Sequence, residues 1–288
     1  MVNYRFEAIG THWEIDIKED LSKDREASLY KKIQARIEIY DKNYSRFRGD
    51  SLVTKISKES GEYEMPEDFD LMISLYKKAY DVTDGLVTPL IGDTLVSLGY
   101  DDKYTLKKGD IKAALSWEDV IDWQKPILKI KKPTMLDFGA CGKGYLVDIV
   151  SEIIENEGVK EYVVDASGDM RQRGSGFIKV GLEDSRDKDV IVGTVEIKNE
   201  SLCGSAGNRR VWEDVNHIVN PKTATSPHGL LGVWTIAETT ILSDLLTTCL
   251  FFTSPEELKK HFDFEYFIVK EDLTVLESPA FQAEIFNS

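Results

Sequence analysis

The sequence predicts an α+β fold in which mixed, largely antiparallel sheets pack against helices. Alternating apolar residues indicate short strands near both ends of the chain, and apolar residues three or four apart indicate helices between them. Strands and helices follow one another without strict βαβ alternation, which argues against a parallel, doubly wound sheet. No Pro-, Gly- or Ser-rich linker divides the 288 residues, so we expect one large domain over 1–288.

The first half of the chain predicts a hairpin followed by two long helices. Alternating residues on either side of Gly10 and Thr11 indicate two strands and a tight turn. Apolar residues at helical spacing predict helices over 22–40 and 67–82. The polar segment 41–58 is expected to be a loop, and 103–126 is expected to be a variable insertion.

The second half predicts a strand at 127–130, a glycine-rich loop, an amphipathic helix over 145–154 and a series of strands. A short apolar helix is expected over 243–252, and a capping box with Pro at the first helical position begins another helix at Ser254. The remaining strands are expected at 162–165, 178–182, 190–197, 232–237, 265–270 and 273–276.

Composition narrows the class of protein. The 36 basic and 51 acidic residues give a net charge of −15, which argues against nucleic-acid binding because that function needs a basic face. No apolar run is long enough for a transmembrane helix. The opening residues lack a basic and apolar leader, so a cytoplasmic location is expected, or an extracytoplasmic one if a leader has been removed. The three cysteines have no zinc or disulfide spacing and are expected to be buried thiols.

The glycine-rich segment 136–145 (LDFGACGKGY) is the most informative part of the chain. A strand end, three glycines and the first turn of a helix follow one another, which is typical of a site where backbone approaches an anion such as phosphate. It is not a P-loop, because Asp137 and Gly144 stand where that motif needs Gly and Ser or Thr. The acid and Lys143 indicate another kind of phosphate site.

Two further segments carry residues suited to chemistry. Ser243 is expected to cap a helix, which places Asp244 and Thr248 on one face of its first turns. A carboxylate and a hydroxyl suit Mg²⁺, although an N-terminal acid and a backbone-bonded threonine have the same pattern. His217, before a turn, is a candidate general base, and a structural histidine is the alternative.

Together, eight segments in this order resemble the ApbE family of FAD:protein FMN transferases over nearly the whole chain. Asp148 extends the glycine-loop motif. The segments are 9–13 (IGTHW), 41–51 (DKNYSRFRGDS), 84–89 (DGLVTP), 136–145, 165–169 (DASGD), 204–210 (GSAGNRR), 217–223 (HIVNPKT) and 244–248 (DLLTT).

The chain departs from the family pattern at several positions. Ile9 replaces a methionine expected to lie on the flavin, and Leu86-Val87 replaces Phe-Asp. Asn220 and Ala224 replace the Asp and Gly of the histidine motif. The family's Gly-Gly pair is Gly139-Ala140 in this chain, and the segment 166–168 (ASG) has one glycine fewer than the family pattern. In 205–207 (SAG), an alanine separates the serine and glycine that are adjacent in the family pattern. The lysine and the Mg²⁺ pair are retained.

The resemblance implies an enzyme that transfers FMN from FAD to a Ser or Thr hydroxyl of a target flavoprotein, releasing AMP. The acceptors it implies resemble FMN-binding subunits of ion-pumping quinone reductases. It implies His217 as the base and Mg²⁺ held by Asp244, Thr248 and the Ala140 carbonyl. The residues implied to bind FAD are Ile9, Gly10, Thr11, Ser45, Arg46, Leu86, Val87, Thr88, Asp137, Lys143 and Val219.

Two other functions remain open at this point. An FAD pyrophosphatase, releasing FMN and AMP to water, would use the same residues. A non-catalytic flavin-binding protein is favoured by the lost glycines and Asn220, and opposed by the retained Asp244, Thr248 and Lys143. Asp137, Arg46 and Thr88 also have purely structural alternatives as a turn cap, an ion-pair partner and a turn former.

Overall fold

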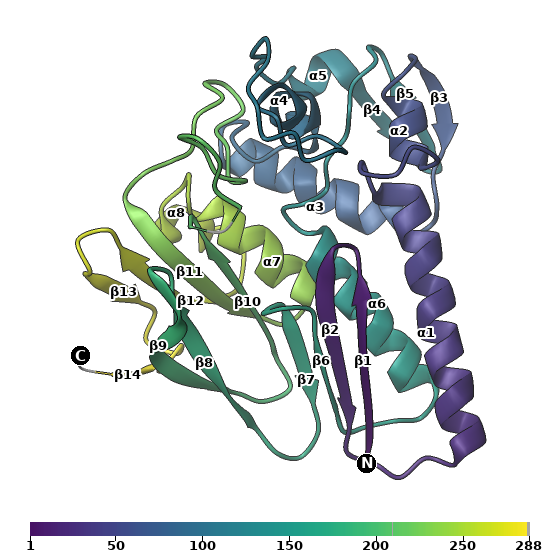
Figure 1. Ribbon diagram of the computed structural model, residues 1–288, viewed down its shortest axis with the longest axis vertical. Coiled ribbons are helices and arrows are strands. Elements are labelled where there is room, and N and C mark those ends of the chain that lie inside the picture. The colour runs from purple at the N-terminus through teal and green to yellow at the C-terminus, as the bar shows by residue number, and fades with distance from the viewer. Residues whose placement is uncertain (209, 287–288) are drawn as a thin grey trace.

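An eight-stranded antiparallel sheet forms the centre of the computed structural model (Figure 1), which describes residues 1–208 and 210–286, the side chain of Lys188 excepted. The strand order is β1-β2-β6-β7-β10-β11-β12-β13. The strands are β1 (Val2–Ala8), β2 (Thr11–Ile17), β6 (Tyr162–Asp165), β7 (Met170–Arg173), β10 (Ser201–Ala206), β11 (Leu230–Ala237), β12 (Glu265–Lys270) and β13 (Val275–Glu277).

Two three-stranded sheets complete the β structure. One, in the order β14-β9-β8, is built from β8 (Ile178–Asp184), β9 (Asp187–Ile197) and β14 (Glu284–Ile285). The other, in the order β3-β5-β4, is built from β3 (Gly61–Glu64), β4 (Ile121–Gln124) and β5 (Ile127–Ile130). All pairings in the three sheets are antiparallel, which confirms the expected α+β class.

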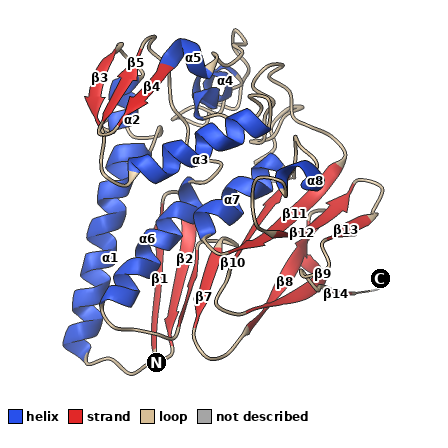
Figure 2. Ribbon diagram, turned by 180° about the vertical axis from the view of Figure 1, so that it is seen from behind, coloured by secondary structure: helices blue, strands red, loops and turns tan. Residues whose placement is uncertain are grey.

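Helices α6 and α7 cover one face of the large sheet, and the β8–β9 hairpin covers part of the other (Figures 1 and 2). Each face has its own apolar core, because sheet residues alternate between the two sides. Of the described helices, none is long and apolar enough to span a membrane. The helices are α1 (Lys23–Tyr44), α2 (Leu52–Ile56), α3 (Phe69–Val82), η1 (Pro89–Ile91), α4 (Gly92–Ser97), α5 (Trp117–Val120), α6 (Gly142–Asn156), α7 (Thr240–Cys249) and α8 (Pro255–Leu258).

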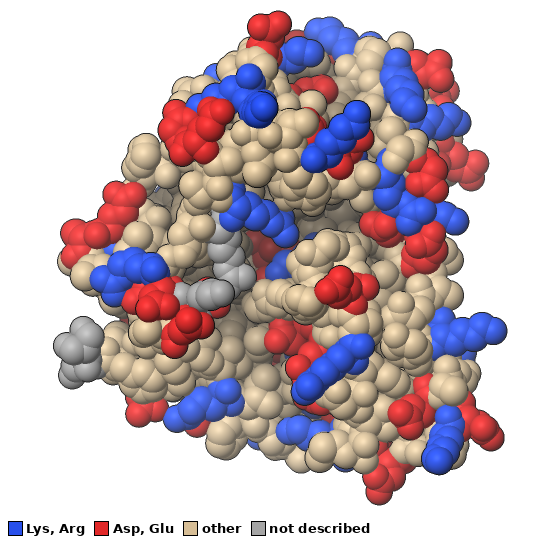
Figure 3. Space-filling model, in the orientation of Figure 1, with Lys and Arg blue, Asp and Glu red and all other residues tan. Residues whose placement is uncertain are grey.

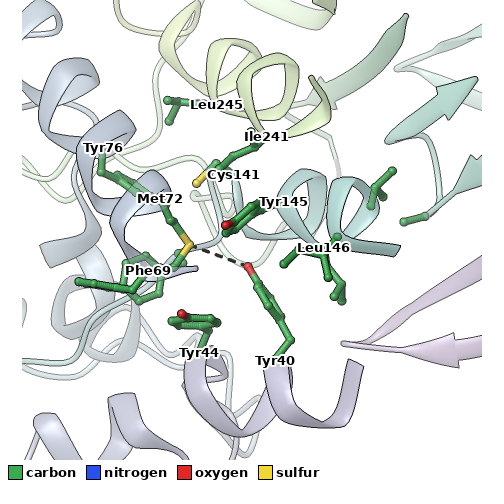
Figure 4. Close-up of a cluster of buried hydrophobic side chains, with 14 of the residues drawn as sticks. Tyr40, Tyr44, Phe69, Met72, Tyr76, Cys141, Tyr145, Leu146, Ile241 and Leu245 are labelled. Atoms are coloured by element: carbon green, nitrogen blue, oxygen red, sulfur yellow. Dashed lines mark hydrogen bonds between the residues drawn. The ribbon is translucent and has the colours of Figure 1, made fainter. Parts of the chain in front are cut away.

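A cluster of aromatic side chains joins α1, α3 and α6 under the glycine-rich loop (Figure 4). Tyr40 and Tyr44 lie on successive turns of α1, and the Tyr40 hydroxyl approaches the Met72 sulfur at 3.9 Å. Phe69 and Tyr145 complete the cluster from α3 and α6. These rings are buried, and they fix the loop that follows β5 against three helices.

Several predicted elements are confirmed and several are wrong. The opening hairpin, the strands β5, β6 and β12, and helix α3 match their predictions. The segment 41–58 is not all loop, because α1 continues to Tyr44 and α2 follows. The segment 103–126 contains α5 and β4 rather than irregular structure alone. Strands β3, β7 and β10 were not predicted, because their sequences are short and rich in polar or small residues.

Helix α7 begins three residues before the predicted start, so Ser243 is not its cap. The Ser243 hydroxyl instead donates to the Thr235 carbonyl at 2.8 Å. The N-cap residue is Thr239, which makes no side-chain cap bond. Asp148 of α6 takes that role, because its two carboxylate oxygens accept the N–H groups of Thr240 and Ile241 at 2.9 and 2.8 Å. Asp244 and Thr248 therefore lie in the middle and last turn of α7.

We expect Asp148→Ala to lower the free energy of unfolding by at least about 2 kcal/mol, because it removes a helix cap and leaves a nearly buried cation unpaired. Asp148 also forms an ion pair with Arg171 at 2.8 Å, and both side chains are mostly buried. Urea denaturation provides the measurement. Glu152→Ala, an exposed position one turn further along α6, is the control and should change stability by less than about 0.5 kcal/mol. An equal effect of the two variants would contradict the capping role.

Candidate functional site

Side chains from α1 and α3 hold the glycine-rich loop between Leu136 and α6. The Gly139 N–H donates to Asp137 Oδ1 at 2.7 Å, and the Ala140 N–H donates to the Tyr76 hydroxyl at 3.1 Å. The Tyr40 hydroxyl donates to the Gly142 carbonyl at 2.9 Å. A Cβ on Gly139 would lie 2.8 Å from Asp137 Oδ1, so it would displace the carboxylate that accepts the Gly139 N–H. The loop is therefore rigid before any ligand binds.

Arg46 lies buried beside this loop, directly after the C-cap residue of α1. Its guanidinium forms an ion pair with Asp137 and donates to the Tyr100 carbonyl at 2.7 Å. It also lies over two aromatic rings, 4.1 Å from the Phe47 centroid and 4.7 Å from that of Tyr100. The structural roles considered for these residues are therefore present. Arg46 forms an ion pair, and the Asp137 carboxylate holds the turn of the loop. Thr88 caps η1 by accepting the Leu90 N–H at 3.2 Å.

We expect Arg46→Ala to lower the free energy of unfolding by about 3–5 kcal/mol, because the carboxylate of Asp137 would stay mostly buried without its partner. Arg5→Ala is the matched control, since the Arg5–Glu14 pair lies on the surface and should contribute less than about 1 kcal/mol. Chemical denaturation of both variants measures the difference. A small effect at Arg46 would mean that Asp137 is held by other groups.

Helices α6 and α7 meet at a close contact that carries three charged groups. The Gly144 N–H donates to Asp244 Oδ2 at 2.8 Å. One residue earlier, the Lys143 ammonium lies 2.9 Å from Asp169 Oδ2 and donates to the Ala166 carbonyl at 2.9 Å. Lys143 thereby ties the turn between β6 and β7 to the first turn of α6.

The charges of Lys143, Asp169 and Asp244 do not cancel at this contact between α6 and α7. Burial raises the pKa of Asp244 well above its usual value, and the nearby Asp169 raises it further. Burial lowers the pKa of Lys143, but the two carboxylates outweigh this and the net pKa is raised. When both acids are ionised, two carboxylates share one ammonium. A bound cation would supply the missing positive charge.

Asp244 and Thr248 line a narrow cavity of about 150 Å³ together with Ala140. Oxygen ligands from a carboxylate, a hydroxyl and a main-chain carbonyl suit a hard cation such as Mg²⁺. In the described part of the chain, no three His, Cys, Asp or Glu side chains cluster so as to hold a metal. A site of this kind fits Mg²⁺, which is usually held by one or two carboxylates together with substrate phosphates. The other predicted residues that line this cavity are Leu86, Val87, Thr88, Asp137, His217 and Val219.

A second cavity of about 430 Å³ adjoins the first and shares Phe47, Tyr100, Asp137, Gly139 and Arg210 with it. Its charged lining consists of four cations and two carboxylates, although the whole chain is strongly acidic. Figure 3 shows basic side chains at the hollow in the middle of this face. The cavity suits a polyanionic ligand with an aromatic part. The predicted residues that line it are Ile9, Gly10, Thr11, Ser45, Arg46, Asp137 and Lys143.

His217 lies on a loop whose backbone is fixed by side chains. Asn216 Oδ1 accepts the Ile218 N–H at 2.8 Å, and Asn220 Oδ1 accepts the Lys222 N–H at 2.9 Å. Ala224 closes the loop with a φ of 56°, in the left-handed region that favours glycine. This is the position where the family pattern has glycine, so alanine here has the backbone conformation that glycine adopts with less strain.

The structure thus brings every predicted site residue to one of two neighbouring cavities. Sequence reasoning gave no site role to several lining groups, among them Phe47, Tyr100, Tyr104 and Ser205. It also gave no role to Asp169 or Arg210, although both stand in the quoted motifs. Arg210 donates to the Tyr100 hydroxyl at 3.0 Å. Arg209, the other arginine of segment 204–210, lies outside the described residues.

Comparison with known proteins agrees with this arrangement. A family model described as the ApbE family matches residues 9–266. A protein of Escherichia coli strain K12 named FAD:protein FMN transferase is 23% identical over 275 residues, covering 88% of this chain and 78% of the relative. A Klebsiella pneumoniae protein of the same name is 25% identical over 252 residues, covering 81% and 79%.

Solved structures show the same fold. The ApbE protein of Thermotoga maritima superposes with a TM-score of 0.84 at 20% identity, covering 97% of both chains. The flavin transferase ApbE of Vibrio cholerae superposes with a TM-score of 0.80 at 15% identity, also covering 97% of both. With nearly the whole chain matched by the family model, this chain belongs to the ApbE family.

Proposed function

We propose that this member of the family transfers FMN from FAD to a Ser or Thr hydroxyl of an acceptor protein, in a reaction that depends on Mg²⁺. The hydroxyl oxygen bonds to the FMN-side phosphorus of the pyrophosphate, the bond to the bridging oxygen breaks, and AMP leaves. The observation that carries the proposal is the convergence of Asp244, Thr248, Ala140 and His217 on one cavity beside a basic, aromatic one.

Transfer at a pyrophosphate needs charge neutralisation and in-line positioning more than covalent catalysis. Asp244, Thr248 and the Ala140 carbonyl would hold Mg²⁺, which supplies a positive charge for the pyrophosphate oxygens. The rigid glycine loop and the basic residues of the larger cavity would hold FAD, with its flavin or adenine against Phe47 and Tyr104. His217 would accept the proton of the acceptor hydroxyl.

The test is incubation of the protein with FAD and MgCl₂, with and without an FMN-binding subunit of an ion-pumping quinone reductase as acceptor. A gain in acceptor mass equal to one FMN minus one water, together with AMP release and loss of both in EDTA, supports the proposal. Release of free FMN and AMP with no mass gain on the acceptor would mean that the protein is an FAD pyrophosphatase. Intact FAD, bound equally with or without Mg²⁺, would mean a flavin-binding protein without catalysis.

We expect His217→Gln to lower the rate of FMN transfer by about 10²–10⁴-fold, because a positioned base contributes roughly that much. The dissociation constant for FAD, measured by flavin fluorescence, should change by less than about threefold, since the base acts on the acceptor. His228→Gln, an exposed position in the same region of the chain, is the control and should leave both quantities unchanged. An unchanged transfer rate in His217→Gln would remove this histidine from the mechanism.

A further inference from the structure

In the large sheet, the two short strands β6 and β7 leave a gap between one end of β2 and one end of β10. The β6–β7 hairpin is shorter than the strands beside it. The pairing of β6 with β2 ends at Asp165 and Glu14, and that of β7 with β10 ends at Met170 and Leu202. Beyond these pairs, β2 and β10 continue with no described strand between them. We use the term sheet notch for the gap bounded by 11–13 of β2, 166–169 of the turn and 203–206 of β10.

Two cavities on opposite faces of the sheet meet at Ser205 of β10. On the face covered by β8 and β9, a groove of about 430 Å³ is lined by Ser167, Gly168, Val180, Gly204, Ser205 and Trp234, among others. Ser205 also lines the small cavity with Asp244 on the helix side, where its hydroxyl lies 2.8 Å from that of Thr247. A peptide in the groove would therefore lie across β10 from the candidate metal ligands.

The edge of β10 in the sheet notch has the chemistry that recognises an extended peptide. Residues Cys203–Ala206 pair with β11 on one side, so alternate N–H and C=O groups point to the other side, where β7 has ended. An open strand edge of this kind accepts a further strand. The floor next to it is flat, because the indole of Trp234 lies where a Cβ on Gly204 would be, 2.8 Å from Trp234 Cδ1.

We propose that the segment of the acceptor protein that carries the target hydroxyl binds in this groove as an extended strand along 203–206 of β10. This inference rests on the proposed function, and it adds the place and the form in which the acceptor binds. Main-chain pairing with β10 would orient the segment, and the passage beside Ser205 would admit one Ser or Thr side chain to the small cavity. FAD would enter separately, through the larger cavity on the other side of Lys143.

Hydrogen exchange of the unmodified protein tests the location. We expect the acceptor subunit, added without FAD, to slow amide exchange in 203–206, and FAD alone to slow exchange in 137–144 but not in 203–206. Equal protection of 203–206 by FAD alone would assign the groove to FAD and overturn the proposal. An acceptor that binds without protecting 203–206 would also overturn it.

A variant that fills the groove tests its function. Val180→Trp should raise the KM for the acceptor by at least about tenfold and change the KM for FAD by less than about twofold. Lys179→Trp, the neighbouring and exposed position of β8, is the control and should change neither. An unchanged acceptor KM in folded Val180→Trp, or a raised FAD KM, would contradict the proposal.

The two proposals fail in different ways. If the wild-type protein makes no FMN–acceptor adduct, the proposed function fails, whereas acceptor-dependent protection of 203–206 still supports the groove. If the adduct forms at the same acceptor KM in wild type and Val180→Trp, the proposed function stands and the groove is wrong. Hydrogen exchange on the wild type needs no variant, so a poorly folded Val180→Trp leaves the test intact.

Discussion

Gly144→Ala is expected to move α6 away from α7, to lower the stability of the protein and to abolish its activity. A Cβ at this position would lie 2.3 Å from the Thr240 carbonyl oxygen and 2.7 Å from Asp244 Cβ. Neither atom is the end of a flexible side chain, so the helices themselves must move apart. Alanine is normally the better helix residue by about 1 kcal/mol, and here the steric cost reverses that preference.

Overpacking costs about 1–3 kcal/mol in typical cores, and we expect Gly144→Ala to lie at or above the upper end. Guanidinium denaturation measures the change, and the FMN-transfer assay measures the effect on the site. Gly49→Ala is the control, because its added Cβ would meet nothing within 4 Å. If Gly144→Ala kept wild-type stability, the contact between α6 and α7 would have to be looser than the structure shows.

Asp244→Asn is expected to lower FMN transfer by about 10³-fold or more and to leave the protein at least as stable as the wild type. The activity loss follows from removal of the carboxylate proposed to hold Mg²⁺ at the pyrophosphate. The stability result follows from burial. Because burial raises the pKa of Asp244, ionisation costs folding free energy at neutral pH, and Asn resembles the protonated form.

The way in which this stability difference changes with pH follows from the linkage between proton binding and folding. A group whose pKa is raised by folding stabilises the protein below its unfolded pKa, and that contribution is lost as the pH rises through the folded value. The advantage of Asn over Asp should therefore grow with pH in metal-free buffer. Differential scanning fluorimetry with and without Mg²⁺ and FAD measures it, and exposed Asp263→Asn is the control. A large loss of stability in Asp244→Asn would indicate that the carboxylate is mainly a structural acceptor for the Gly144 N–H.

Local patterns picked out residues that the structure gathers around two cavities, but they missed several strands of the sheet that carries them. Local patterns sufficed where a residue is fixed by its own neighbours, as in the turn of the opening hairpin, where Ile9 and Gly10 have φ of 46° and 74°. Local patterns failed where a residue is fixed by a partner that is distant in the sequence. The start of α7 is set by Asp148, which is 92 residues away from Thr240 in the chain.

Strands β7 and β10 show the same limit. Arg171 and Gln172 do not resemble a central strand, but each has a partner supplied by the fold: Asp148 for Arg171, and the Asn199 N–H and Gly176 carbonyl for Gln172. In β10, small residues are required because Gly204 lies against the indole of Trp234. No local propensity indicates either requirement.

The hydrogen bond between Gly144 and Asp244 joins residues 100 positions apart in the chain. Closing a loop of that length has an entropic cost, which must be met before the contact is gained. Before α6 and α7 dock, Asp244 and Thr248 do not yet lie beside the glycine-rich loop. The cation site that we propose is therefore complete only once these two helices have docked.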